Sequence, residues 1–140
     1  MPDAAELLAR AQELHSQGNI DDALVTARSA IEAQPDHVEA WMYLGTTLIT
    51  RRLAFVEGLS SLEHASALAP DDPGVAYSMG WCYEFVAYRL EKQAMKPFRD
   101  PIELYELAAE RLRHCIALDP EPGLQEDAHD LLVGIEDRLE

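Results

Sequence analysis

The chain has 140 residues, of which 48% are hydrophobic and 26% charged, proportions typical of one globular domain that buries its own core. Eleven Lys and Arg against 26 Asp and Glu give a net charge of −15, which repels nucleic-acid phosphates and anionic membrane surfaces. No apolar run approaches the roughly 20 residues that span a bilayer, and the N-terminus lacks the basic start and apolar stretch of a secretory signal. We therefore expect a cytoplasmic protein with no nucleic-acid partner and no membrane insertion.

Residues that carry chemistry do not gather along the sequence. Cys82 and Cys115 have no second pair and no Cys-x-x-Cys spacing, which favours buried thiols over a disulfide framework or a zinc site. The histidines show no His-x-x-x-His spacing, and neither a glycine-rich phosphate loop nor a nucleophile motif is present. We expect no cofactor and no metal, and the sequence predicts that the protein is not an enzyme.

Three segments of the chain share one pattern, a small residue five positions before a proline and an acid directly after that proline. These segments are Ala30 to Asp36, Ala65 to Asp71 and Cys115 to Glu121. Because the residue before a proline avoids the helical conformation, each segment is predicted to be a helix that ends at a proline turn.

The first unit of the chain contains two helical segments ahead of its proline. Gly18 and Asn19 separate these segments, and both residue types permit a tight turn. Asp21 follows directly and is predicted to cap the second helix. The first unit is therefore expected to be a helical hairpin.

The second unit carries the residues through which the chain resembles the tetratricopeptide-repeat family. The repeat of that family begins with a bulky residue, continues with Leu-Gly, and later carries small residues and a closing proline. In the second unit these roles fall to Trp41, Leu44, Gly45, Leu48, Ala65 and Pro70. The first unit matches with Leu7, Ala11, Leu14, Ala23, Ala30 and Pro35, and the third with Met79, Gly80, Tyr83, Ala108, Cys115 and Pro120. The resemblance covers residues 4 to 120.

This resemblance implies an all-α fold, a right-handed α-solenoid of three helical hairpins within a single domain over residues 1–140. The repeats are expected at 4–37, 38–72 and 73–121. The second repeat departs from the family pattern, because it has one extra residue in the inner turn between Thr50 and Phe55 and because Gly58 replaces the usual Ala. Its turn is therefore predicted to be atypical.

The third unit is longer than the others, since its closing proline lies 50 residues after the previous one, where the first two are 35 residues apart. Asp100, Pro101 and Glu103 are typical of an N-cap, a first-turn proline and a capping-box acid. We expect helices over 74–95 and 101–118, joined at 96–99 and forming an elongated hairpin.

The segment after the last repeat has one apolar stripe at helical spacing and does not match a fourth repeat. A helix is predicted over 122–139. Repeat proteins need an amphipathic terminal helix to cover the exposed end of the stack, so we expect this helix to be the cap.

The resemblance also implies a concave groove, lined by the first helix of each repeat, that holds a peptide of a partner protein in an adaptor or chaperone-like role. Transfer of the repeat positions gives ten groove residues, which are Leu8, Gln12, Met42, Thr46, Ile49, Tyr77, Trp81, Glu84, Phe85 and Tyr88. The four aromatic residues share one helix face. Two interpretations stay open: an apolar groove with aromatic anchors for a peptide, or core aromatics covered by the long hairpin or the terminal helix.

Some family members clamp the C-terminal carboxylate of heat-shock chaperones with Lys, Arg and Asn at groove positions. The corresponding positions here are Leu8, Gln12, Tyr43, Gly74 and Ser78, so that clamp is absent. The resemblance therefore favours an apolar or aromatic peptide segment as the ligand.

Four of the eleven basic residues gather near the predicted hairpin tip, namely Arg89, Lys92, Lys96 and Arg99. A solvated tip and a contact patch for an acidic partner both fit this cluster. In the second case the acidic partner can be another copy of the chain. The alternative function is therefore a structural scaffold, a homo-oligomer that self-associates through the elongated third hairpin and the capping helix.

Overall fold

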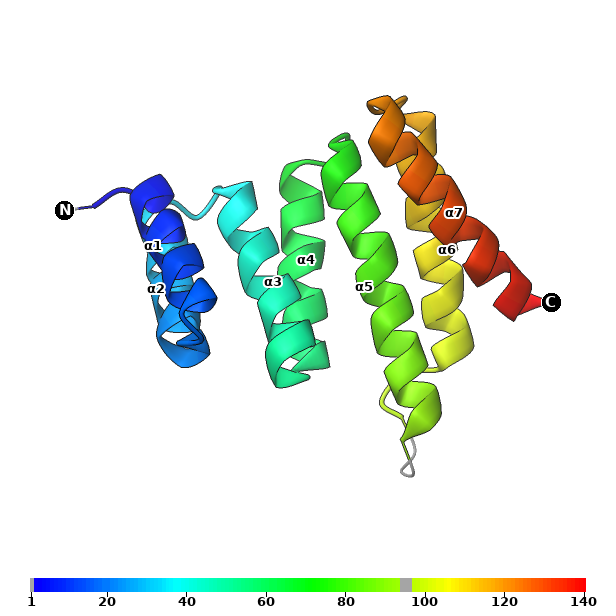
Figure 1. Ribbon diagram of the computed structural model, residues 1–140, viewed down its shortest axis with the longest axis horizontal. Coiled ribbons are helices and arrows are strands. Elements are labelled where there is room, and N and C mark those ends of the chain that lie inside the picture. The colour runs from blue at the N-terminus through cyan, green and yellow to red at the C-terminus, as the bar shows by residue number, and fades with distance from the viewer. Residues whose placement is uncertain (1, 94–96) are drawn as a thin grey trace. The chain divides into compact units, whose positions relative to one another are not determined.

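The computed structural model describes residues 2–93 and 97–140. Within these ranges every regular element is a helix, which confirms the predicted all-α fold of helical hairpins (Figure 1). The helices are α1 (Ala4–Ser16), α2 (Ile20–Ala33), α3 (Val38–Arg52), α4 (Phe55–Leu68), α5 (Pro73–Lys92), α6 (Pro101–Ala117) and α7 (Pro122–Leu139). They form two compact units, Met1–Ala69 with α1 to α4 and Pro70–Glu140 with α5 to α7.

The first unit consists of two hairpins, α1 with α2 and α3 with α4, and α2 packs on α3. The turn of the first hairpin requires Gly18, whose φ of 84° lies in the left-handed region. Fully buried alanines of α1 and α2 let the two backbones approach closely. The core between the hairpins is a cluster of four aliphatic residues, Ile20, Leu24, Leu44 and Leu48.

The predicted cap of α2 was wrong. The N-cap residue is Asn19, and its side chain makes no capping hydrogen bond. Asp21 lies instead in the first turn of α2, where its Oδ1 accepts a hydrogen bond from Nη2 of Arg52 at 2.8 Å. The side chain therefore ties α2 to the end of α3, while its charge still meets the positive end of the helix dipole.

The second hairpin brings α3 and α4 into contact at two glycines. A Cβ built on Gly45 would lie 2.7 Å from Cγ of Leu62 and 2.9 Å from the carbonyl oxygen of Gly58. The connection between the helices is the atypical turn that the sequence predicts, because Leu53 has a φ of 53° in the left-handed region. A non-glycine residue in that conformation costs about 1–2 kcal/mol.

The second unit begins with the elongated hairpin, in which α5 has 20 residues and α6 has 17. The predicted start of α6 is confirmed: Asp100 is its N-cap, and Oδ1 of Asp100 accepts a hydrogen bond from the Ile102 amide at 3.0 Å. Helix α5 ends at Lys92, three residues before the predicted end at 95, and the rest of the predicted end lies outside the described residues. Close packing of α5 on α6 depends on Gly80, because a Cβ there would lie 2.7 Å from Leu112 Cγ.

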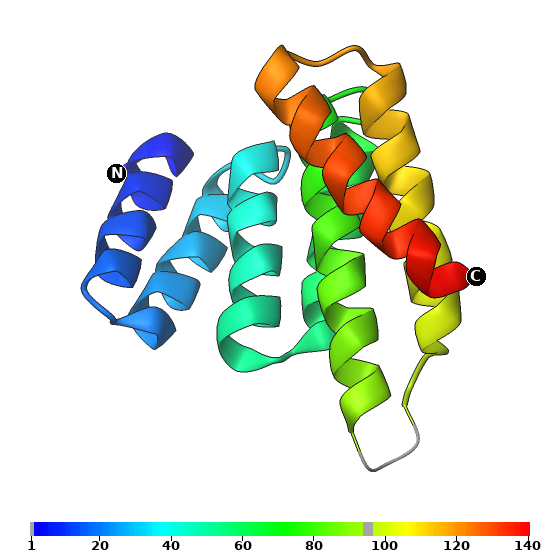
Figure 2. The ribbon, with the colours of Figure 1, turned by 45° about the vertical axis from the view of Figure 1, so that its right-hand side comes forward.

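The terminal helix α7 covers 122–139 as predicted. It packs along α6 and also contacts α5, as the two ribbon views show (Figures 1 and 2). Ala128, Leu132 and Ile135 form its buried face. The side chain of Glu121 caps the helix by accepting hydrogen bonds from the amides of Gly123 and Leu124.

Candidate functional site

The aromatic face of α5, formed by Tyr77, Trp81, Phe85 and Tyr88, is the first candidate surface. All four side chains are partly exposed, and Tyr88 is 44% exposed. The opposite side of α5 is the core side, where Met79, Tyr83, Val86 and Leu90 are buried. The aromatic face is therefore not simply core, since the helix already has a complete buried side.

Basic side chains lie on two of these rings. The guanidinium of Arg89 lies 5.4 Å from the centroid of the Phe85 ring, and Nζ of Lys92 lies 5.2 Å from that of Tyr88. Arg138 of α7 also lies over Tyr88, at 5.3 Å. Exposed cation–π contacts of this kind contribute about 0.5–1 kcal/mol each. The C-terminal part of the aromatic face is thus positively charged within an acidic chain.

The end of α7 is fixed next to this face by a small polar network. The Tyr105 hydroxyl donates a hydrogen bond to Oε2 of Glu91 at 3.2 Å and accepts one from Nη1 of Arg138 at 3.3 Å. Arg138 also lies 3.7 Å from Oε2 of Glu91. The pKa of Tyr105 is raised to about 12, mainly by burial and also by the charge of Glu91, while the charge of Arg138 opposes both effects. The phenol is therefore neutral at physiological pH.

Helix α7 affects two further groups of α5. Burial raises the pKa of Glu84, and the positive charge of Arg138 counteracts the rise. Burial also raises the pKa of Tyr77, to which the negative charge of Asp127 in α7 adds. The sequence left open whether the aromatic residues of α5 form an accessible groove or a covered core. Helix α7 covers a portion of the aromatic face and leaves the rest accessible.

The groove residues predicted in the first unit divide into two groups. Gln12 is exposed, and Met42 and Thr46 are half-buried. Leu8 and Ile49 are 6% and 0% exposed, so their assignment to an accessible groove was wrong. Ile49 fills the space left by the missing side chain of Gly58, since a Cβ there would lie 2.5 Å from Ile49 Cγ1.

The predicted basic cluster is only partly a cluster of free cations. Arg89 and Lys92 are exposed and lie on aromatic rings. Arg99 forms an ion pair with Glu103 at 3.0 Å, one helical turn further along the chain. Lys96 lies outside the described residues.

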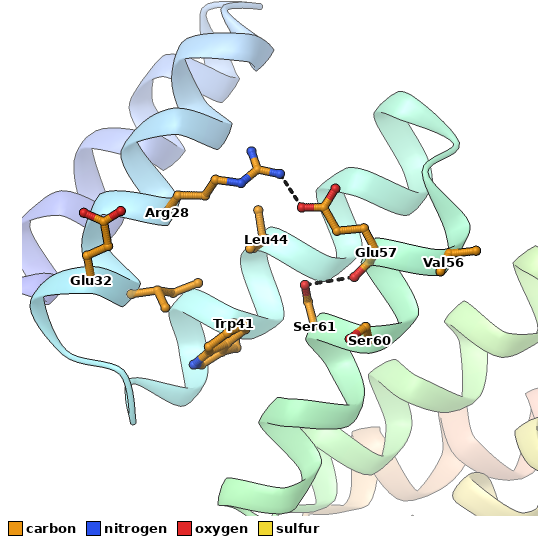
Figure 3. Close-up of a pocket in the computed structure, with 9 residues that line it drawn as sticks. Arg28, Glu32, Trp41, Leu44, Val56, Glu57, Ser60 and Ser61 are labelled. Atoms are coloured by element: carbon orange, nitrogen blue, oxygen red, sulfur yellow. Dashed lines mark hydrogen bonds and ion pairs between the residues drawn. The ribbon is translucent and has the colours of Figure 1, made fainter.

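Sequence reasoning missed a pocket in the first unit. It has a volume of about 650 Å³ and lies between α2, α3 and α4 (Figure 3). Its lining consists of Arg28, Ile31 and Glu32 of α2, Trp41 and Leu44 of α3, and Val56, Glu57, Ser60 and Ser61 of α4. The sequence signal was the pair of small residues Ser60 and Ser61 on α4, which leave space next to Trp41 and Leu44.

Other chemistry receives no support from the described parts of the chain. Cys82 and Cys115 are buried free thiols, as predicted, and burial raises the pKa of both, which disfavours the nucleophilic thiolate. Among residues 2–93 and 97–140, no group of three or more His, Cys, Asp or Glu is arranged to hold a metal ion. Of the described helices, none combines the length and the apolar character needed to cross a membrane.

The hairpins have small residues where their helices meet, and the two hairpins of the first unit stack with bulky residues between them, which defines a helical-repeat protein. The family model for the tetratricopeptide repeat matches residues 4–47, that is, the first hairpin and most of α3. The match identifies a tetratricopeptide repeat in this part of the chain.

Solved structures share the fold over almost the whole chain. The first tetratricopeptide-repeat domain of Spaghetti (RPAP3), bound to the HSP90 peptide SRMEEVD, is 17% identical, with a TM-score of 0.69 over 98% of this chain and 93% of that chain. YrrB, described as a tetratricopeptide-repeat protein with an unusual peptide-binding site, is 22% identical, with a TM-score of 0.67 over 93% and 58% of the two chains. The N-terminal domain of stress-induced protein-1 from C. elegans is 15% identical, with a TM-score of 0.61 over 91% and 93%. At these identities the likeness is one of fold.

Proposed function

We propose that the chain is a non-catalytic protein-interaction module of the cytoplasm, an adaptor or chaperone-like protein that binds an apolar or aromatic peptide segment of a partner on the aromatic face of α5. The observation that carries this proposal is the partial exposure of Trp81, Phe85 and Tyr88 on a helix whose other side is already buried core. Aromatic anchors bury a large area at little cost in side-chain entropy, and for this reason they are enriched at binding hot spots.

The charges around this face favour a partner with acidic residues beside its apolar anchor. Arg89 and Lys92 are exposed next to the rings, while the carboxyl of Glu84 already faces Arg138. A carboxylate of the partner can therefore pair with Arg89 or Lys92 without displacing an internal ion pair. The peptide bound to the Spaghetti domain, SRMEEVD, also carries adjacent acids, although the carboxylate clamp of chaperone-tail readers has no counterpart at Gln12, Gly74 or Ser78.

The test is an affinity capture from the lysate of the native organism with the parent chain, Trp81→Ala and Phe98→Ala. Phe98 is an exposed aromatic residue outside the aromatic face, so its variant controls for a general loss of apolar surface. A partner retained by Phe98→Ala and lost by Trp81→Ala, with far-UV circular dichroism unchanged, supports the proposal. Identical sets of bound proteins for all three chains would refute it.

A second candidate is the self-associating scaffold, and the exposed apolar residues around the hairpin tip favour it. Phe98 and Ile102 are 48% and 45% exposed, close in sequence to Arg89 and Lys92 in a chain whose net charge is −15. A second copy offers the acidic surface that these cations complement. Light scattering after size-exclusion chromatography tests this: an oligomer that Arg89→Glu with Lys92→Glu converts to a monomer supports it, and a monomeric parent chain contradicts it.

A further inference from the structure

We propose a second peptide site on the first unit, across the last two turns of α2, that binds a basic segment with a bulky apolar residue on each side of a Lys or Arg. This surface is distinct from the aromatic face of α5. It consists of the 650 Å³ pocket between α2, α3 and α4, a neighbouring pocket of about 410 Å³ next to α1, and Glu32 between them.

The register of α2 places Glu32 between the two pockets. At 3.6 residues per turn, Ile31, Arg28, Glu32, Ser29 and Ala33 follow one another around the helix in that order. Ile31 and Arg28 line the larger pocket, Ser29 and Ala33 line the smaller one, and Glu32 lines both. The carboxylate therefore lies on the ridge that separates two cavities on one face.

The larger pocket has preformed apolar walls. Leu44 belongs to the buried cluster between the hairpins, and Ile31 packs against that cluster. The indole of Trp41 is held by a hydrogen bond from its Nε1 to the carbonyl oxygen of Pro35 at 2.7 Å and by the His64 ring, whose centroid lies 4.0 Å away. A pocket with fixed walls binds a bulky side chain without first having to order itself.

The mouth of this pocket is amphipathic. Arg28 extends from α2 to form an ion pair with Glu57 of α4, as Figure 3 shows. Val56 beside it is 65% exposed, a large apolar side chain that a bound segment would cover. The ion pair is exposed to solvent, so it contributes little to stability and can exchange partners with a ligand. The second pocket adds apolar lining from Pro2 and Leu7.

Charge selects a cationic residue between the two apolar anchors. Glu32 lies in the last turn of α2, which contains no basic residue, so its carboxylate adds to the negative end of the helix dipole. Within the described ranges Glu32 forms no ion pair or hydrogen bond that would neutralise it. A Lys or Arg of the ligand would meet both negative charges at this point, in a chain whose overall charge also attracts it.

The probe is a library of random linear peptides displayed on phage, selected against the full chain and then synthesised for calorimetric measurement of Kd. Four variants sort the selected peptides: Ser60→Trp, which fills the larger pocket from an exposed position of α4, Glu32→Lys, Trp81→Ala and the control Glu110→Lys. Glu110 is exposed on α6 in the other unit, so its variant changes the net charge equally at a residue that lines neither pocket. Circular dichroism establishes that each variant is folded.

We expect selected peptides with two bulky apolar residues around a Lys or Arg. Their affinity should fall about a hundredfold in Ser60→Trp, since one apolar anchor loses its burial, and about tenfold in Glu32→Lys. Trp81→Ala and Glu110→Lys should bind them like the parent chain. The proposal is overturned if no selected peptide depends on both Ser60 and Glu32, or if the peptides that do so carry no basic residue. If every selected peptide depends on Trp81 and none on Ser60 or Glu32, the aromatic face of α5 is supported and this second site is refuted.

Discussion

Gly58→Ala should destabilise the first unit, although alanine is the better helix former and is the usual residue at this repeat position. The added Cβ would lie 2.5 Å from Cγ1 of Ile49 and 3.0 Å from the carbonyl oxygen of Gly45. Neither neighbour yields easily. The first belongs to a β-branched side chain with a restricted χ1, fully buried in the core, and the second is backbone of the facing helix.

The expected magnitude follows from two opposing contributions. Replacing glycine by alanine in a helix interior raises the free energy of unfolding by about 1 kcal/mol, whereas overpacking of a close contact lowers it by about 1–3 kcal/mol. Because a stiff side chain and a backbone atom are the obstacles, the cost lies in the upper part of that range. The free energy of unfolding should therefore fall by about 1–2 kcal/mol.

The assay is urea-induced unfolding followed by the fluorescence of Trp41, the tryptophan of the first unit, in a Trp81→Phe background. Ile49→Ala removes the clashing atom and alone costs about 2–4 kcal/mol. Together with Gly58→Ala it should cost about 1–2 kcal/mol less than the sum of the two single variants, because the new methyl enters the vacated space. Ile49→Val keeps a γ-carbon in place and should show no such relief. A Gly58→Ala variant as stable as the parent chain would refute the reasoning.

Four further outcomes are expected. Gly134→Ala in α7 meets nothing within 4 Å, so it should raise the unfolding free energy by about 0.5–1 kcal/mol, as measured by far-UV circular dichroism; a loss would contradict this. Asp100→Ala should lower it by about 1 kcal/mol through loss of the α6 cap. Arg52→Ala removes an exposed ion pair and an exposed hydrogen bond to the Arg51 carbonyl oxygen, and it should change the unfolding free energy by less than about 0.5 kcal/mol. The folded-state pKa of Tyr105 is raised from 10.0 to about 12, so the unfolded chain loses this proton first and the unfolding free energy should fall between these pH values. In a series of urea curves at different pH, Tyr105→Phe should make that fall less steep. An unchanged slope would contradict the shift.

The sequence predicts the helices well where local chemistry determines their ends. The cap at Asp100 followed by Pro101 starts α6, and the prolines that close the repeats end the preceding helices. The range of α7 is also predictable, because one apolar stripe in an otherwise acidic segment leaves a single face to bury. These signals depend on a few neighbouring residues and need no knowledge of the tertiary structure.

The errors arise where a residue's role depends on the facing helix. Ile49 was assigned to the groove by its position in the repeat, but the missing side chain of Gly58 draws it into the core. Asp21 carries the residue type of an N-cap, yet Arg52 at the end of α3 engages it. The pocket beside Trp41 results from small residues on a second helix and an ion pair to a third, which no periodicity within one helix shows.

The two proposed surfaces carry local charges of opposite sign, and association rates can therefore distinguish them. A basic peptide is attracted both by Glu32 and by the net charge of −15, so its association rate should fall steeply as salt increases. An acidic peptide is attracted by Arg89 and Lys92 and repelled by the negative net charge of the chain. Salt weakens both the attraction and the repulsion, because the Debye length shortens from about 30 Å at 0.01 M to about 8 Å at 0.15 M salt. Its association rate should therefore depend only weakly on salt. Stopped-flow measurements with one peptide of each class provide the comparison, and an equally steep dependence for both would show that local charge does not determine which surface a partner uses.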